Sequence, residues 1–386
     1  MKKYRALALL LCCLYTLLLP ACGQASAPVS QGEGEPSFCG LAHTGRTQLL
    51  YSQQFTADTY EGGYTLLQVQ EGGRYLVVPK GKEPPQGLEA GVGVIRQPVE
   101  GVYLTATAAM CFFDALDGAG AVRFSGTKTE DWTIPSARAG MEQGDILYAG
   151  KYREPDYELL VSEGCGLSVQ STMINHAPEV KEKLEELGVL VVVDRSSYEP
   201  HPLGRSEWVK FYGALLGREE EAAALFQEQQ ALFTQTEGLP ATGRSVAYFY
   251  LTDDGRAVTR KPGDYICKMI EMAGGENALA HVGGEEDSAT VTMEMEEFYT
   301  AAKDADCIIY NGDMSGDLSS VQHLLSLNPL LADFKAVQAG EVWCAKKELF
   351  QSTLQMGTAV ADFHSILSGQ GEAPAFLYRL ESEGAN

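Results

Sequence analysis

The segment that most constrains the fold is residues 167–193, which predicts a strand, a helix and a second strand. An apolar strand begins at Leu167, a helix begins near Pro178, and an unbroken apolar run fills residues 189–193. An apolar run of that length without alternation is typical of a strand covered on both faces. Gly188 stands where glycines commonly end helices, and Glu179 lies near the positive end of the helix dipole. The unit therefore predicts an α/β fold.

The longest helical pattern in the chain spans residues 206–236. Ser206 is a suitable N-cap, and apolar residues recur at helical spacing behind it. Gly217 interrupts the pattern, so we expect the helix to bend or divide there. Alternating strands and helices lie on both sides of this segment, and short strands with Gly and Pro turns fill residues 47–103. We predict two Rossmann-like α/β lobes joined by one long rigid α-helix.

The N-terminus has the layout of a bacterial lipoprotein signal. Lys2, Lys3 and Arg5 precede an apolar run too short to span a bilayer, and Leu19-Pro20-Ala21-Cys22-Gly23 follows it. These five residues resemble a lipobox, in which Cys22 receives the lipid. The Gly-, Ser- and Pro-rich residues that follow have the composition of a flexible tether. We expect an extracytoplasmic protein held at the outer face of the cell membrane by lipidated Cys22.

These patterns predict five segments: a signal peptide at 1–21, a lipidated tether at 22–38, an N-terminal lobe at 39–205, the connecting helix at 206–236 and a C-terminal lobe at 237–386. The formal net charge of −23 argues against nucleic acid as a partner, because phosphate binding needs a basic surface. Six cysteines remain after Cys22, without a CxxC pair. One or two disulfides stay open as an alternative, but we favour six small buried thiols.

Several motifs resemble the periplasmic-binding-protein family of iron-complex and cobalamin importers. The first-lobe motifs are Tyr148-Ala149-Gly150-Lys151-Tyr152, Ser171-Thr172-Met173-Ile174 and Ser196-Ser197-Tyr198-Glu199-Pro200-His201-Pro202-Leu203-Gly204-Arg205-Ser206-Glu207-Trp208. The second-lobe motifs are Ala273-Gly274-Gly275-Glu276-Asn277 and Asp304-Ala305-Asp306-Cys307-Ile308-Ile309-Tyr310. The resemblance covers about residues 120 to 370, and the segment before it is similar to the clostridial-type branch.

The resemblance implies a class III binding protein, the type with a helical backbone between its lobes. Its implied function is to capture a ferric siderophore, haem or cobalamin between the lobes and to deliver it to an ABC permease and its ATPase. We expect a monomer without a cofactor of its own and without enzymatic activity. Members present one glutamate on each lobe to the permease, and Glu179 and Glu296 match these positions. Glu294 and Glu297 are neighbouring alternatives to Glu296.

The family's ligand-facing positions also carry over by motif. They fall on Tyr152, Met173, Tyr198, His201, Tyr250, Arg260, Tyr265, Asn311, Phe350 and Gln351. Aromatic rings offer flat contact to a planar or lipophilic chelate, and arginine pairs with carboxylates or catecholates. Met173 and His201 together would also suit the iron of haem.

Three other functions have less support in the sequence. A manganese or zinc receptor needs about three histidines and a carboxylate between the lobes. The six histidines are scattered and do not show that arrangement, so free-metal binding is the second choice. An extracytoplasmic enzyme is less favoured, because the chain has no GxSxG, SxxK or HExxH motif. A sensory receptor would share the same two-lobed architecture.

Overall fold

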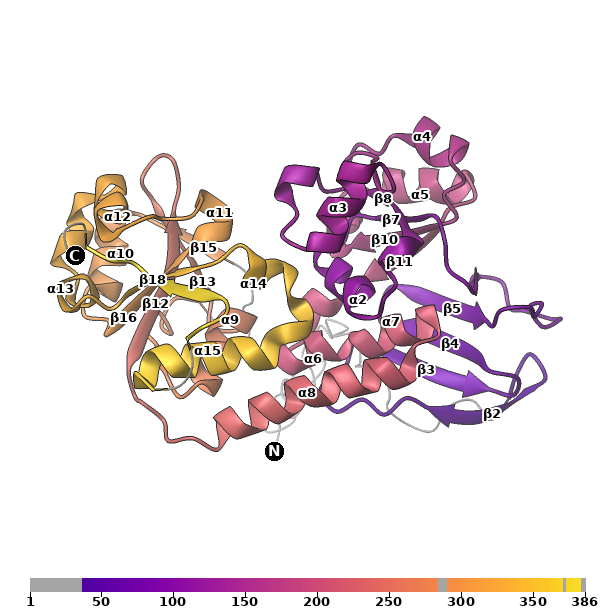
Figure 1. Ribbon diagram of the computed structural model, residues 1–386, viewed down its shortest axis with the longest axis horizontal. Helices are drawn as coiled ribbons and strands as arrows, with labels where there is room; N and C mark the ends of the chain where they lie inside the picture. Colours follow the sequence, from indigo (N-terminus) through magenta and orange to yellow (C-terminus); the bar gives the residue numbers. More distant parts are fainter. Residues whose placement is uncertain (1–36, 284–289, 371–372, 383–386) are drawn as a thin grey trace, which may run out of the picture.

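A computed structural model describes residues 37–283, 290–370 and 373–382. Cys22, the predicted signal segment and the tether up to residue 36 lie outside the described residues. The described part is an α/β structure with three sheets, and Figure 1 shows two lobes side by side with helices α8 and α15 running between them. Within this part, no helix combines the length and apolar character needed to cross a membrane. The predicted α/β fold with two lobes is confirmed.

The first sheet precedes the N-terminal α/β unit and has six strands in sequence order. All neighbours are antiparallel except the last pair, which is parallel. The strands are β1 (Ser37–Phe38), β2 (Leu41–Arg46), β3 (Phe55–Tyr60), β4 (Tyr64–Val69), β5 (Gly73–Val78) and β6 (Val92–Arg96). The predicted tether is thus too long by two residues, because Ser37 and Phe38 pair with β2 and Phe38 is 1% exposed.

The loop before β3 is anchored by two buried glutamates from the motif that precedes the connecting helices. The Glu207 carboxylate accepts hydrogen bonds from the backbone N–H groups of Leu50, Tyr51 and Ser52, at 2.8 to 3.0 Å. Glu199 accepts from the N–H groups of the next two residues and from Trp208 Nε1. Five consecutive amides therefore bind two carboxylates, which ties the first sheet to the centre of the molecule.

The N-terminal lobe has a five-stranded parallel sheet in the order β11-β10-β7-β8-β9. Its strands are β7 (Val102–Leu104), β8 (Val122–Ser125), β9 (Leu147–Tyr148), β10 (Leu167–Ser171) and β11 (Leu190–Asp194). Its helices are α2 (Met110–Ala115), α3 (Pro135–Gln143), α4 (Tyr157–Ser162) and α5 (Pro178–Glu186). The strand, helix and strand predicted at residues 167–193 are β10, α5 and β11. Val191 and Val193 face one apolar cluster and Val192 another, as expected for a strand covered on both faces.

The connecting helix was predicted at residues 206–236 with Ser206 as its N-cap, but the helical segment begins at Pro202 with His201 as N-cap and is divided into three parts. These are α6 (Pro202–Glu207), α7 (Val209–Leu216) and α8 (Glu219–Glu237). Gly217 ends α7 with a left-handed backbone at φ 71°, which glycine adopts without strain. The expected division at Gly217 is confirmed, and α8 carries the chain from the N-terminal lobe to the C-terminal lobe. Its 19 residues extend for about 28 Å.

The C-terminal lobe has a mixed seven-stranded sheet, in which β14, β12, β16 and β17 are parallel. Its strands are β12 (Ser245–Leu251), β13 (Ala257–Arg260), β14 (Glu276–Asn277), β15 (Thr290–Met293), β16 (Cys307–Asn311), β17 (Val342–Ala345) and β18 (Leu377–Arg379). Its helices are α9 (Tyr265–Met272), α10 (Met295–Ala302), α11 (Gly312–Ser315), α12 (Val321–Leu327), α13 (Lys335–Ala339), α14 (Glu348–Gln351) and α15 (Met356–Ser368). The sequence predicted β12, β16 and β17 of the parallel core but neither β14 nor the antiparallel strands β13, β15 and β18.

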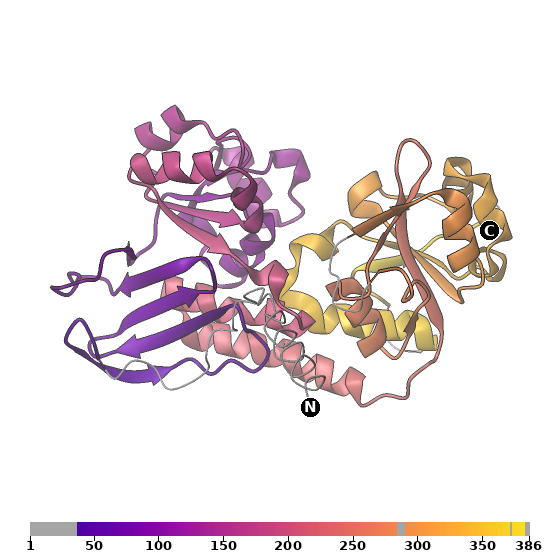
Figure 2. The same cartoon turned by 180° about the vertical axis from the view of Figure 1, so that it is seen from behind.

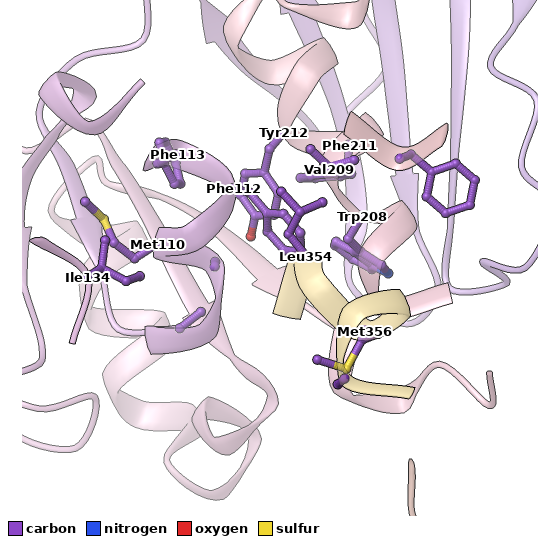
Figure 3. Close-up of a cluster of buried hydrophobic side chains, with 14 of the residues drawn as sticks. Met110, Phe112, Phe113, Ile134, Trp208, Val209, Phe211, Tyr212, Leu354 and Met356 are labelled. Atoms are coloured by element: carbon purple, nitrogen blue, oxygen red, sulfur yellow. The ribbon is translucent and has the colours of Figure 1, made fainter. Parts of the chain in front are cut away.

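One apolar core continues from the N-terminal lobe into the C-terminal lobe. At its centre, Phe112 of α2 stacks on Tyr212 of α7 with ring centroids 5.1 Å apart, and Leu354 and Met356 enter from the C-terminal lobe (Figure 3). Helix α15 lies along α8 in both views (Figures 1 and 2), so close that a Cβ on Gly357 would lie 2.1 Å from the Gln229 carbonyl oxygen. Since interiors pack at crystal-like density, this shared core restrains relative motion of the lobes.

Candidate ligand-binding site

The carboxyl edges of the two parallel sheets face each other. The loop after β8 and the helix after β17 make direct contact, because the Thr133 N–H donates to Gln351 Oε1 at 2.9 Å. In open α/β sheets, ligands bind outside the carboxyl ends of the strands. The facing edges are therefore where the residues of a binding site should lie.

Large apolar side chains are exposed at these edges. Tyr148 ends β9, and Met173 and Tyr198 follow β10 and β11; these side chains are 40%, 44% and 57% exposed, respectively. Met314, in α11 after β16, is 53% exposed in the opposite lobe. Side chains of this kind are usually buried, so their presence at one edge indicates a contact surface for an apolar partner. Met173 and Tyr198 were predicted, and Tyr148 stands in a motif already noted. No sequence signal pointed to Met314.

A buried polar cluster lies at the carboxyl edge of the C-terminal sheet. Asn311, at the end of β16, has no exposed surface, and within the described part of the chain neither atom of its amide group has a hydrogen-bond partner. The Tyr248 hydroxyl on the same sheet face is also buried without a partner there. Burial raises the pKa of Tyr248 well above its ordinary value, so the hydroxyl keeps its proton. Buried polar groups normally have partners, which makes these two groups candidates for ligand contact.

Arg260 and Tyr265 belong to the same cluster. Arg260 Nη1 lies 3.5 Å from Asp264 Oδ2, and burial raises the pKa of this carboxyl, although the guanidinium opposes the shift. The pKa of Tyr265 is also raised, mainly by burial. Three of the predicted residues, Arg260, Tyr265 and Asn311, are thus brought to one region by β13, α9 and β16.

Arg205 completes the cluster and was not selected from the sequence. Its guanidinium carbon lies 3.8 Å from the Tyr265 ring centroid, a cation–π stack that joins α6 to α9. Arg205 is half-buried, and it has neither a hydrogen-bond acceptor nor an ion-pair partner among the residues described. It stands within a motif that carried the resemblance, Gly204-Arg205-Ser206. Asp194 and Asp264 lie within electrostatic range of this guanidinium, but neither forms an ion pair with it among the described residues, so it is suited to hold an anionic group of a ligand.

His201 has a different role from the predicted one. Its Nδ1 accepts a hydrogen bond from the Leu203 N–H at 3.1 Å, which caps α6, and its ring lies 4.4 Å from that of Tyr51. Burial and the nearby Lys268 ammonium lower the pKa of His201 to about 4. The neutral ring therefore carries its proton on Nε2, and ligation of iron by His201 would require this cap to break. The haem-iron pair of Met173 and His201 stays a prediction.

The remaining predicted contacts lie apart from the polar cluster. Gln351 is 5% exposed and its amide is engaged by the N-terminal lobe, so it is not free to bind a ligand. Phe350 is half-buried and packs against the shared core. Tyr152 packs against the outer cluster of the N-terminal lobe, beneath the Arg153 guanidinium, and Tyr250 packs on the second cluster of the C-terminal lobe.

A family model described as periplasmic binding protein matches residues 114–349, which is more than half of the chain. The chain belongs to the periplasmic binding protein family. Membership supports a solute-binding role. The matched region contains the N-terminal parallel sheet from β8 onward, the connecting helices and most of the C-terminal sheet, whereas the first sheet lies outside it.

Relatives and solved structures agree with this membership. An uncharacterized lipoprotein of Methanocaldococcus jannaschii is 23% identical over 314 residues, which cover 77% of this chain and 72% of the relative. A periplasmic binding protein from Veillonella parvula has a TM-score of 0.58 at 15% identity, covering 83% of this chain and 99% of that one. The periplasmic heme binding protein HutB of Vibrio cholerae has a TM-score of 0.55 at 15% identity, covering 67% and 96%. At these identities the two structures show the fold alone.

A third structure, from an ABC-type Fe3+-hydroxamate transport system of Saccharomonospora viridis, has a TM-score of 0.52 at 17% identity and covers 70% of this chain and 93% of that one. Each lobe of the present chain carries an acidic helix start. Glu179 lies in the first turn of α5 and Glu296 in the first turn of α10, and both are exposed. Glu294 and Glu297 beside Glu296 are exposed as well.

The cysteines and histidines of this periplasmic binding protein form no site in the part that the structure describes. The six cysteines found there are free thiols; four are buried, whereas Cys39 and Cys111 are partly exposed, so the preferred interpretation of six buried thiols holds for four of them. The same residues contain no group of three or more His, Cys, Asp or Glu that could hold a metal ion.

Proposed function

We propose that this chain is an extracytoplasmic solute-binding lipoprotein of an ABC importer. It captures an iron complex, such as a ferric siderophore or haem, or else cobalamin, between its lobes and delivers it to the permease. Its family, the lipoprotein relatives, and solved structures whose names refer to heme and Fe3+-hydroxamate transport support this proposal. The lipobox-like residues that end at Cys22 support anchoring at the outer face of the membrane.

One observation carries the proposal for the ligand. Arg205 is a half-buried guanidinium, stacked on Tyr265 and without a paired anion among the described residues, and it lies where the carboxyl edges of the two sheets meet. Exposed Met173 and Tyr198 supply apolar contact from the N-terminal lobe. A flat or lipophilic chelate with carboxylate, hydroxamate or catecholate oxygens matches this combination, since it presents both an apolar body and anionic groups.

Ligand titration tests this function. The fragment from Ser37 onward should bind haemin or a ferric catecholate, with a Soret band for haem or with quenching of tryptophan fluorescence. The variant Arg205→Gln should weaken binding of the anionic probe by roughly tenfold or more, since a charge-assisted contact is lost. The matched control is Arg218→Gln, which removes an exposed guanidinium paired with Glu221. This variant should bind the probe normally. Equal affinities for both variants, or no binding of any chelate, would refute the proposal.

The lipid anchor has a separate test. Cells that express the full chain should incorporate labelled fatty acid and keep the protein in the membrane fraction. Cys22→Ala should abolish labelling and release the protein. Labelling that persists in Cys22→Ala would show that another residue carries the lipid.

A further inference from the structure

Gln351 makes hydrogen bonds from one lobe to the other with every polar atom of its side chain. Its Oε1 accepts from the Thr133 N–H at 2.9 Å and from the Thr133 hydroxyl at 2.8 Å. Its Nε2 donates to the Asp131 carbonyl oxygen at 2.8 Å. We infer that Gln351 is a positioning residue, which holds the two lobes at a fixed separation around the ligand. Its effect on ligand exchange rests on the proposed function, whereas its effect on lobe separation does not.

The end of this contact in the N-terminal lobe is rigid. Thr133 stands between Trp132 and Ile134, which are 2% and 8% exposed. The Trp132 Nε1–H donates to Ser125 Oγ, at the end of β8, at 3.2 Å. A displacement of Thr133 would therefore disturb the edge of the parallel sheet, so the hydrogen bonds to Gln351 fix α14 relative to that sheet.

The end in the C-terminal lobe is equally fixed. Gln351 closes α14, in which Leu349 is 1% exposed and belongs to the shared core. Just before α14, the Lys346 N–H donates to the Phe376 carbonyl oxygen at 2.9 Å. Helix α14 is thus fixed to β17 and β18, so Gln351 moves together with the C-terminal lobe.

Other polar contacts between the lobes lie elsewhere or are weaker. Lys268 Nζ donates to the Pro200 carbonyl oxygen at 3.0 Å, and Arg205 stacks on Tyr265, both next to α6. Lys347 Nζ lies 3.4 Å from Asp131 Oδ1, but these side chains are 35% and 54% exposed, and exposed ion pairs contribute little. Because Gln351 lies apart from α6 and from the α8–α15 pair, its hydrogen bonds oppose rotation of the lobes about those contacts.

Loss of this contact should act on ligand exchange. In the intact protein the carboxyl edges stand at one spacing, so a bound chelate leaves only when the Gln351 hydrogen bonds open. Without them, the opened arrangement is more populated and the ligand dissociates faster. The association rate should change little, because the walls of the site keep their residues.

Amide hydrogen exchange tests the contact directly, because the Thr133 N–H is one of its donors. In Gln351→Ala, exchange at Thr133 should accelerate by roughly tenfold or more relative to the intact chain. The control Gln355→Ala changes an exposed residue of the same segment and should leave this rate unaltered. Thr133→Ala removes the hydroxyl and keeps the N–H, so it should give a smaller acceleration and serves if Gln351→Ala does not fold.

Two further measurements complete the test. Small-angle scattering should show a larger radius of gyration for Gln351→Ala than for Gln355→Ala. Haemin loaded on Gln351→Ala should transfer to apomyoglobin several-fold faster, with an unchanged association rate. Equal exchange at Thr133 and equal scattering in the two variants would overturn the inference, whether or not haemin binds. Failure of the intact chain to bind haemin and other chelates would instead count against the proposed function, because exchange and scattering need no ligand.

Discussion

Individual side chains decide much of the chemistry at the centre of this molecule. Glu199, His201, Arg205 and Glu207 lie within nine residues, yet each does something different. Two bind backbone amides, one caps a helix, and one stacks on an aromatic ring of the other lobe. The motif showed that the segment matters. It could not show these roles, because the partners come from residues 50–54 and from α9, which only the fold brings near.

His201 provides a prediction about pH. Its folded pKa of about 4 lies below the ordinary value near 6.5, so the unfolded chain takes up the proton first. The stability that it contributes is therefore fully present above pH 6.5 and is lost as the pH falls towards 4. The intact chain should lose on the order of 2 kcal/mol over this range relative to His201→Gln. Urea unfolding at several pH values measures the difference, and parallel curves would contradict the assigned environment.

Glu207 provides a prediction about stability. Its carboxylate has no exposed surface and accepts from three backbone amides and from Lys210 Nζ. Glu207→Gln places an NH₂ group among these donors and removes the charge, so the free energy of unfolding should fall by about 2–4 kcal/mol. Glu221→Gln, at an exposed carboxylate, is the control and should change it by less than about 0.5 kcal/mol. Denaturant titration of both variants gives the comparison.

At the level of the elements, the sequence predicted the parallel core well. Continuous apolar runs such as residues 189–193 and 307–310 became β11 and β16, because burial on both faces leaves a pattern that no other element shares. Strands β13, β15 and β18 were missed, since they are short and lie towards the edges of the sheet, where polar residues are tolerated. The candidate site follows the same rule. Arg260 and Asn311 stand at strand ends, where the sequence placed them, and their contact with ligand stays a prediction, whereas Met314 follows no sequence pattern.

The hairpin of α7 and α8 depends on the turn between them. Gly217 has φ 71°, and a Cβ at this position would lie 3.2 Å from Gln97 Nε2. Gly217→Ala should therefore lower the free energy of unfolding by about 1–2 kcal/mol. The control is Gly120→Ala, where φ is not positive and no atom lies within 4 Å of the added Cβ. A thermal melt of the two variants decides the matter, and equal midpoints would show that the turn tolerates a side chain.

At the level of the whole molecule, the shared apolar core and the pair α8 and α15 make the two lobes a stiff unit. A permease that engages both lobes would therefore meet docking residues at a nearly fixed distance from each other. Glu179 and Glu296, one on each lobe, are the proposed docking residues. The sequence pointed to both through the family's motifs, and nothing in their local packing distinguishes them from other exposed acids at helix starts.

Substitution of these two glutamates should lower import of the ligand without lowering the affinity for it. In the double variant Glu179→Ala and Glu296→Ala, affinity for the chelate should stay within about twofold, because both side chains are exposed in the first turns of α5 and α10 and neither is among the predicted ligand contacts. Import of the labelled chelate into cells should fall roughly tenfold, as expected when two charge-assisted contacts are removed. Glu182→Ala, an exposed acid on α5, controls for loss of surface charge. Normal import by the double variant would assign docking to other residues.

The binding of Glu199 and Glu207 by five amides has a practical consequence for anyone who shortens this protein. A fragment cut to the region shared with the rest of the family would lack the loop that satisfies both acids by hydrogen bonding. Each acid would then keep a single side-chain donor, Trp208 for Glu199 and Lys210 for Glu207, and the shortened chain should aggregate or unfold. The first sheet is therefore needed for folding, and a fragment that folds has to begin at β1.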